Sequence, residues 1–117
     1  MFIRYLLLCL TAAALFAQNT DLARALQPSR QRINTLDGEI VKLLNERAQV
    51  VHEVGLIKKR YHAQASAPGR EEQVVQRASE QARAPLTASA VQAIYKTILH
   101  EMSAMEQAEI DKSANPQ

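Results

Sequence analysis

The chain has 117 residues, a formal net charge of +2 and 47% apolar residues, which suits one small folded domain and excludes a disordered polar tail. Aromatic residues make up only 4%, and Gly (3) and Pro (4) are scarce, which argues against an all-β core with many tight turns. The single cysteine, Cys9, excludes a disulfide framework and a Cys-based zinc site. Because Ala, Leu, Gln, Glu, Arg and Lys dominate, and these residues favour helices, we expect an all-α fold.

Residues 1–17 have the pattern of a signal peptide. Arg4 supplies a positive start, and an apolar run of about 13 residues follows from Tyr5 to Ala17, which is too short to span a bilayer comfortably. An uncleaved membrane anchor is the alternative. Cleavage after Ala17 leaves about 100 residues without cysteine, which suits an oxidising compartment. We expect a periplasmic or secreted protein with no stable membrane association after cleavage.

An apolar seam with alternating steps of three and four residues predicts a long first helix. Pro28 fits the first turn of this helix, which extends to about Tyr61 over roughly 33 residues, or about 50 Å. A compact domain of about 100 residues has a radius of gyration near 13 Å, so the rest of the chain cannot cover such a rod. We therefore expect a homodimer. The seam consists of Ile33, Leu36, Ile40, Leu43, Val50, Val54 and Ile57.

Two shorter helices are expected after a linker at residues 63–69. The second helix is predicted over Arg70–Arg83 and is ended by Pro85. Thr87 is the expected N-cap of the third helix, which ends near Ile110. The domain then covers residues 18–110, and the polar residues 111–117 form a flexible tail. The expected apolar faces are Val74, Val75 and Ala78 on the second helix and Val91, Ile94, Ile98, Met102 and Met105 on the third.

Two cations lie on the face of the first helix that the apolar seam defines. The seam reaches Arg47 where an apolar residue is due, which costs free energy unless the arginine is paired or meets a ligand. Lys58 lies 11 residues later on the same face, about 16 Å along the helix. Together they could clasp a small anion. The alternatives are that Arg47 pairs with a core Glu or reaches solvent, and that Lys58 is a solvated helix-end cation.

Arg30 flanks the same seam one turn before Ile33. It lies about 42 Å from Lys58 along the helix, so the two cannot share a small-molecule site within one chain. In an antiparallel dimer, Arg30 could reach the site of the partner subunit.

These residues, in this order and spacing, resemble the AroQ-type chorismate mutases. The resemblance extends from about Leu26 to Gln107 and implies an intertwined all-helical homodimer with three helices per chain. It implies that the small-molecule substrate chorismate, a dicarboxylate, is rearranged to prephenate, a step of aromatic amino acid biosynthesis, without cofactor or metal. The residues that carry it are Arg30, Ile33, Leu36, Asp37, Ile40, Leu43, Leu44, Arg47, Val54, Gly55, Lys58, Arg70 and Glu71.

The resemblance also implies a role for each polar residue. Arg47 and Arg30 of the partner subunit would hold the two carboxylates, and Lys58 would donate to the ether oxygen of the breaking bond. Glu71 would accept from the ring hydroxyl, and Arg70 would support the loop and the carboxylates beside it. A unimolecular pericyclic reaction needs orientation and fixed positive charge rather than a nucleophile, and Arg and Lys supply both.

Three positions depart from the family pattern. Ala67 replaces an Asp that often precedes the Arg-Glu pair, and Met102 and Glu106 stand where the third helix often has Ser and Gln. Ser103 and Gln107 follow one residue later, where a turn of about 100° makes them unsuitable substitutes in an undistorted helix. Ionised, Glu106 would oppose negative charge on the ether oxygen, whereas a protonated Glu106 donates as Gln does. We hypothesise that Glu106 acts protonated, so that activity rises toward acidic pH; a solvated helix-end carboxylate is the alternative.

Two other functions remain open at this point. An isochorismate-pyruvate lyase of the same fold also uses Arg and Lys, and a non-catalytic helical binding protein could retain the scaffold. Near-neutral charge and few aromatic residues argue against nucleic-acid binding. His52, His62 and His100 lack close metal-ligand spacing and are interpreted as ordinary polar positions.

Overall fold

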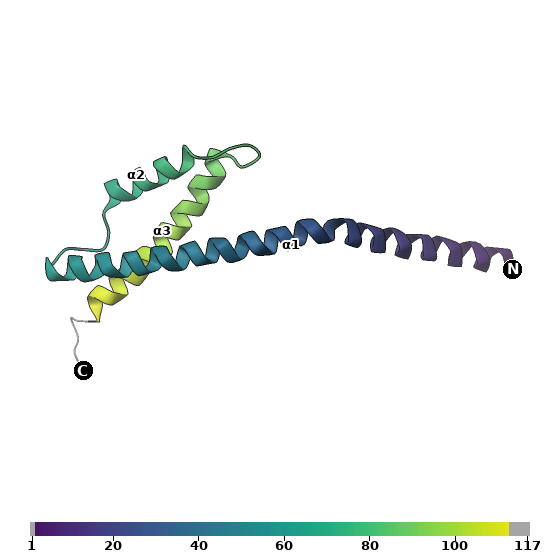
Figure 1. Cartoon of the computed structure of the whole chain (residues 1–117), viewed down its shortest axis with the longest axis horizontal. Helices are drawn as coiled ribbons and strands as arrows, with labels where there is room; N and C mark the ends of the chain where they lie inside the picture. The colour runs from purple at the N-terminus through teal and green to yellow at the C-terminus, as the bar shows by residue number, and fades with distance from the viewer. Residues whose placement is uncertain (1, 113–117) are drawn as a thin grey trace. The chain divides into compact units, whose positions relative to one another are not determined.

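Three α-helices make up the fold, in agreement with the all-α prediction and its long first helix. The structure is a computed structural model that describes residues 2–112, with side chains from residue 14 onward except that of Pro68. The helices are α1 (Phe2–Arg60), α2 (Pro68–Ser79) and α3 (Ala88–Asp111) (Figure 1). The chain divides into two units, Met1–Leu43 and Leu44–Gln117, of which the second contains the last part of α1 together with α2 and α3.

The first helix is longer than predicted. It was expected to begin near Pro28, but it begins at Phe2, and Pro28 lies inside it. The cause is local: no Gly or Pro occurs between residues 2 and 27, where Leu and Ala are frequent and favour a helix. Pro28 removes one backbone N–H donor from α1 without ending it. The predicted signal segment is part of this helix. Among the described residues, no helix combines the length and apolar character needed to cross a membrane.

The part of α1 in the first unit has an exposed apolar face. The seven large apolar side chains between residues 22 and 43 are exposed by 37% to 63%. Exposed apolar surface of this extent is typical of a face that packs against another protein surface. These residues are Leu22, Leu26, Ile33, Leu36, Ile40, Val41 and Leu43.

A Schellman motif ends α1. The Ala63 N–H donates to the Lys58 carbonyl at 2.8 Å, and the His62 N–H donates to the Lys59 carbonyl at 3.1 Å. His62 occupies the left-handed position of this motif, with φ 54°, where Gly is the usual residue. The motif reverses the chain immediately after Lys58 and leads it into the linker.

Helix α2 begins and ends earlier than predicted. It begins at Pro68 because a proline at the first helical position gives up a donor that would be unpaired there in any case. It ends at Ser79 rather than Arg83. From Gln81 onward the backbone N–H groups bond three residues back instead of four, so tight turns replace the helix before Pro85 is reached.

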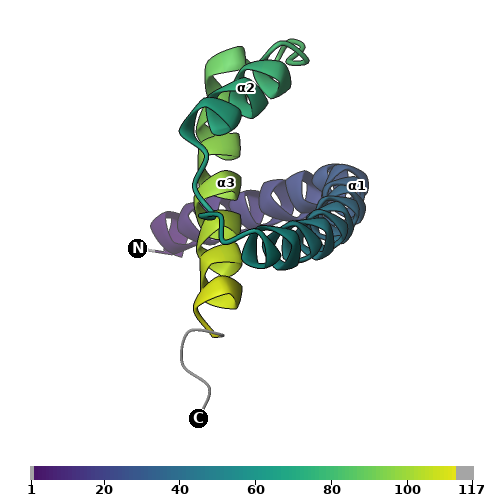
Figure 2. The ribbon, with the colours of Figure 1, turned by 90° about the vertical axis from the view of Figure 1, so that its left-hand side faces the viewer.

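Helix α3 agrees closely with the prediction. The Thr87 hydroxyl accepts from the Ala90 N–H at 3.1 Å, which confirms the N-cap, and the helix ends at Asp111. Val91 and Met102 are buried, whereas Ile94 and Met105, which were expected on the apolar face, are about half exposed. Helices α2 and α3 lie side by side (Figure 2). Residues 113–117 of the predicted tail lie outside the described residues.

Candidate active site

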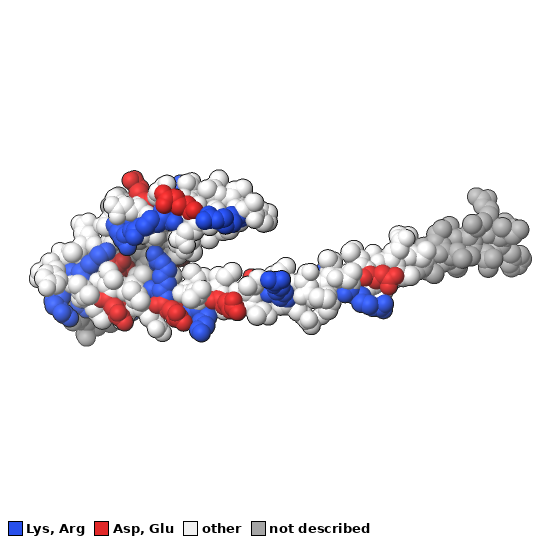
Figure 3. Space-filling model, turned by 45° about the horizontal axis from the view of Figure 1, so that its top comes forward, with Lys and Arg blue, Asp and Glu red and all other residues white. Residues whose placement is uncertain are grey.

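The second unit contains a cavity of about 280 Å³ between the last part of α1, the linker, α2 and α3. Figure 3 shows Lys and Arg side chains around the hollow beside α2, with carboxylates among them. Three cations and two carboxylates line the cavity, so its lining carries one net positive charge. Seven predicted site or departure positions line it: Arg47, Lys58, Ala67, Arg70, Glu71, Met102 and Glu106.

Lys58 and Glu106 form a buried ion pair in this cavity. The Lys58 Nζ lies 2.8 Å from the Glu106 Oε1, and the two side chains are exposed by 25% and 8%. The contact is an ion pair without the alignment of a hydrogen bond. Lys58 Nζ also donates to the Ala65 carbonyl of the linker at 2.6 Å. An ammonium group has three donors and the bond to Ala65 uses one of them, so donors remain for an acceptor in the cavity.

Gly55 allows α3 to approach α1 at this ion pair. Gly55 is buried, and a Cβ placed on it would lie 3.2 Å from the Glu106 Cγ. Gly55 lies one turn before Lys58 on α1. The absence of a side chain at Gly55 therefore determines how closely Glu106 approaches α1 and Lys58.

The variant Gly55→Ala tests whether activity depends on this close approach of Glu106 to Lys58. Gly55→Ala is expected to lower kcat about threefold to tenfold, because a displacement of a few tenths of an ångström changes the position of Glu106. The free energy of unfolding should change by less than about 1 kcal/mol, since the better helix propensity of Ala offsets the close contact. Steady-state kinetics and thermal unfolding measure the two effects.

Gly38 provides the matched control, because a Cβ placed there meets nothing within 4 Å. Gly38→Ala should leave kcat unchanged and stabilise the helix by about 1 kcal/mol. Equal activity of Gly55→Ala and the wild type would contradict the role of Gly55.

Arg47 is a half-buried cation without a carboxylate partner among the described residues. Its guanidinium instead contacts the Met102 sulfur, which is a weak acceptor. The alternative in which Arg47 pairs with a core Glu is therefore not what the structure shows. Arg47 also lines the cavity, and an Arg fork at a cavity is suited to bind a carboxylate ligand.

The start of α2 supplies Arg70 and Glu71. Glu71 is half-buried, and its Oε1 accepts a hydrogen bond from the Ser103 hydroxyl at 3.1 Å, while Arg70 is exposed at the cavity rim. Ala67 also lines the cavity and is the N-cap of α2, where it provides no side-chain cap. The position that often carries Asp in the family therefore faces the cavity here without an acceptor.

Ser103 and Gln107, which follow the two departure positions of α3, are placed differently. Ser103 lines the cavity in an unbroken α3, because the turn that moves it away from Met102 directs it toward α2, which bounds the same cavity. Gln107 is exposed and donates to the Asp111 carboxylate at 2.8 Å. Arg30 is an exposed residue of α1 in the first unit, whereas the residues that line the cavity all belong to the second.

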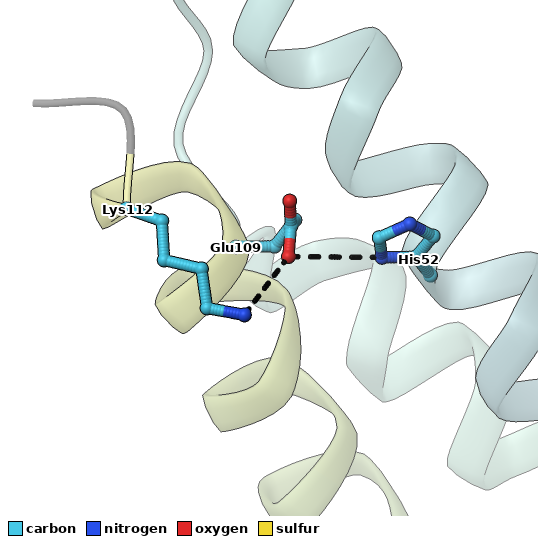
Figure 4. A network of polar contacts seen from close by, with 3 residues as sticks. All are labelled: His52, Glu109 and Lys112. Atoms are coloured by element: carbon cyan, nitrogen blue, oxygen red, sulfur yellow. Dashed lines mark hydrogen bonds and ion pairs between the residues drawn. The ribbon is translucent and has the colours of Figure 1, made fainter. Parts of the chain in front are cut away.

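The histidines occupy separate polar positions. His52 Nδ1 lies 3.9 Å from the Glu109 Oε2, which also pairs with Lys112 Nζ at 3.4 Å (Figure 4). His62 lies in the turn after α1, and His100 is exposed on α3. Over residues 2–112, no three His, Cys, Asp or Glu side chains form a group suited to a metal ion.

Two structural contributors were not identified as such from the sequence. The Ala65 carbonyl holds Lys58, and no side-chain pattern indicates a backbone acceptor in a linker. In the sequence, Gly55 was recognised only as one of the residues that carry the family resemblance. A glycine inside a helix, one turn before a cation, is a signal of close helix approach that could have identified it.

Comparison with known proteins identifies the family of the chain. Residues 29–107 match the family model for chorismate mutase type II. The chain is 35% identical over 79 residues to the bifunctional chorismate mutase/prephenate dehydratase of Neisseria gonorrhoeae (strain ATCC 700825 / FA 1090). That match covers 68% of this chain and 21% of the relative, so this chain matches about a fifth of the relative's length. The chain therefore belongs to the chorismate mutase type II family, and residues 29–107 form its chorismate mutase domain.

Proposed function

We propose that the chain converts chorismate to prephenate as a homodimer in which each cavity is completed by Arg30 of the partner subunit. The observation that carries this proposal is the cavity in which Arg47 and Lys58 meet Glu71 and Glu106, within the residues matched by the family model. The partner's Arg30 adds a further positive charge to a lining that is already net positive, and positive charge attracts the two carboxylates of chorismate.

The residues act by orientation and electrostatics. Arg47 and the partner's Arg30 hold the carboxylates, which keeps the flexible dianion in the folded reactive conformer. As the ether C–O bond breaks and the new C–C bond forms, negative charge grows on the ether oxygen. A free N–H of Lys58 stabilises that charge. Ser103 donates to one carboxylate oxygen of Glu71, and the ring hydroxyl donates to the other.

The exposed apolar face of α1 supports the dimer. It lies in the same helix segment as Arg30, so a second copy that packs on this face brings its own Arg30 into the interface. We further propose that residues 1–17 are a signal peptide and that the protein is periplasmic or secreted. The positive start and the short apolar run support this assignment.

Incubation of the protein with chorismate tests the activity. Chromatography should show prephenate as the product, and Arg47→Ala should remove most of the turnover. Release of pyruvate from isochorismate, with no prephenate from chorismate, would instead assign the lyase activity. A folded dimer that consumes neither compound would contradict catalysis altogether.

The protonation state of Glu106 sets the expected pH dependence. We propose that the active form has a protonated Glu106, which donates to the ether oxygen beside Lys58. Activity should then be higher at acidic pH than at neutral pH, because only the protonated carboxyl group is a donor. Glu106→Gln keeps the donor at every pH, so its profile should be flat between about pH 5 and about pH 8. The measurement is kcat/KM across this range for both proteins.

Two results would contradict this role of Glu106. One is loss of activity in Glu106→Gln at all pH values, because the neutral donor would then be insufficient. The other is an acid-favouring profile that Glu106→Gln leaves unchanged, since another group would then be responsible for the titration.

A further inference from the structure

A second cavity adjoins the catalytic one. It has a volume of about 670 Å³ and lies between α2 and α3. Glu71, Leu99 and Ser103 line both cavities, so they form the wall between them. The Glu71 carboxylate therefore has two open spaces into which its flexible side chain can rotate.

The second cavity offers the Glu71 carboxylate an alternative cationic neighbour. Lys96 and His100 line it, and the Lys96 ammonium attracts a carboxylate. Glu has three side-chain torsions, and only a specific contact fixes them. A Glu71 that turns toward Lys96 is no longer placed to accept from a ring hydroxyl in the catalytic cavity.

The Ser103 hydroxyl is the contact that fixes Glu71. Its Oγ donates to the Glu71 Oε1 at 3.1 Å, and both side chains are half-buried. A hydroxyl inside a helix often bonds back to its own helix, as Thr97 does in α3 by donating to the Ala93 carbonyl at 3.2 Å. Ser103 instead bonds across to α2, to a charged acceptor, which makes the bond stronger than a neutral one.

We propose that Ser103 is a positioning residue that holds the Glu71 carboxylate at the catalytic cavity. With Oε1 occupied by Ser103, the second carboxylate oxygen of Glu71 is left for the ring hydroxyl of the substrate. The inference rests on the proposed mutase function and on the role of Glu71 in it. Ser103 acts through Glu71, without a contact of its own to the reacting atoms.

Removal of the hydroxyl is the first part of the test. Ser103→Ala should lower kcat/KM for chorismate about tenfold, the usual effect of losing a hydrogen bond to a charged group. Ser103→Thr retains the hydroxyl and should recover most of the loss. Ser89→Ala is the matched control, because Ser89 is an exposed residue of α3 that lines neither cavity, and it should have wild-type activity.

A double-mutant cycle separates positioning from other roles. In the Glu71→Ala background, Ser103→Ala should cause less than about a twofold further loss, because the group it positions is absent. A full tenfold further loss would overturn the inference, as would a Ser103→Ala single variant within twofold of the wild type. A wild type without turnover would instead overturn the proposed function itself, so the two failures are distinguishable.

Discussion

Lys58→Ala is expected to lower kcat by about 10² to 10³-fold, the usual effect of removing one preorganised donor from developing negative charge. KM should change much less, because the Lys58 donor acts mainly in the transition state, where the ether oxygen becomes negative. Steady-state kinetics with chorismate measure both constants. Lys59→Ala is the matched control in the same turn of α1 and should keep wild-type kcat.

The variant has a second effect that must be separated from the first. Removal of Lys58 leaves the Glu106 carboxylate buried without its partner, which costs about 3 to 5 kcal/mol of stability. Lys58→Ala combined with Glu106→Gln removes the unpaired charge and should recover most of that stability. If the double variant has the same kcat as Glu106→Gln alone, the loss arose from misfolding, and Lys58 is not the donor to the ether oxygen.

Arg30→Ala is expected to lower kcat/KM by about 10² to 10³-fold, the effect of removing one partner of a buried charge pair at an interface. The loss should appear mainly in KM, because a carboxylate is bound in both the ground state and the transition state. Arg32→Ala is the matched control, since Arg32 is also an exposed cation of α1, two residues further along. Equal kinetics of the two variants would exclude Arg30 from the site.

Periodicity in the sequence predicted the helices well but their boundaries less well. The seam spacing defines α1, and Thr87 defines the start of α3, because both signals lie within a few neighbouring residues. The start of α1 was missed because Pro28 does not end the helix when strong helix formers surround it. The end of α2 was missed because its last turns tighten before Pro85.

The candidate site was likewise predicted only in part. The common face of Arg47 and Lys58 follows from 11 residues of one helix, and the structure places both in one cavity. The contact between Ser103 and Glu71 depends on how α3 is rotated against α2, which side-chain packing determines. The spacing of residues within α3 does not show how this helix is rotated against α2, so Ser103 was interpreted only as an unsuitable substitute.

Mixing two variants of low kcat/KM tests the two-chain site most directly. Arg30→Ala and Arg47→Ala dimers each lack an intact site, but a mixed dimer has one site with both arginines and one with neither. After the two variants are unfolded and refolded together, random pairing makes half of the dimers mixed, so about a quarter of the wild-type kcat/KM should return. No return of activity, with mixed dimers demonstrated by mass spectrometry, would contradict a site shared between subunits.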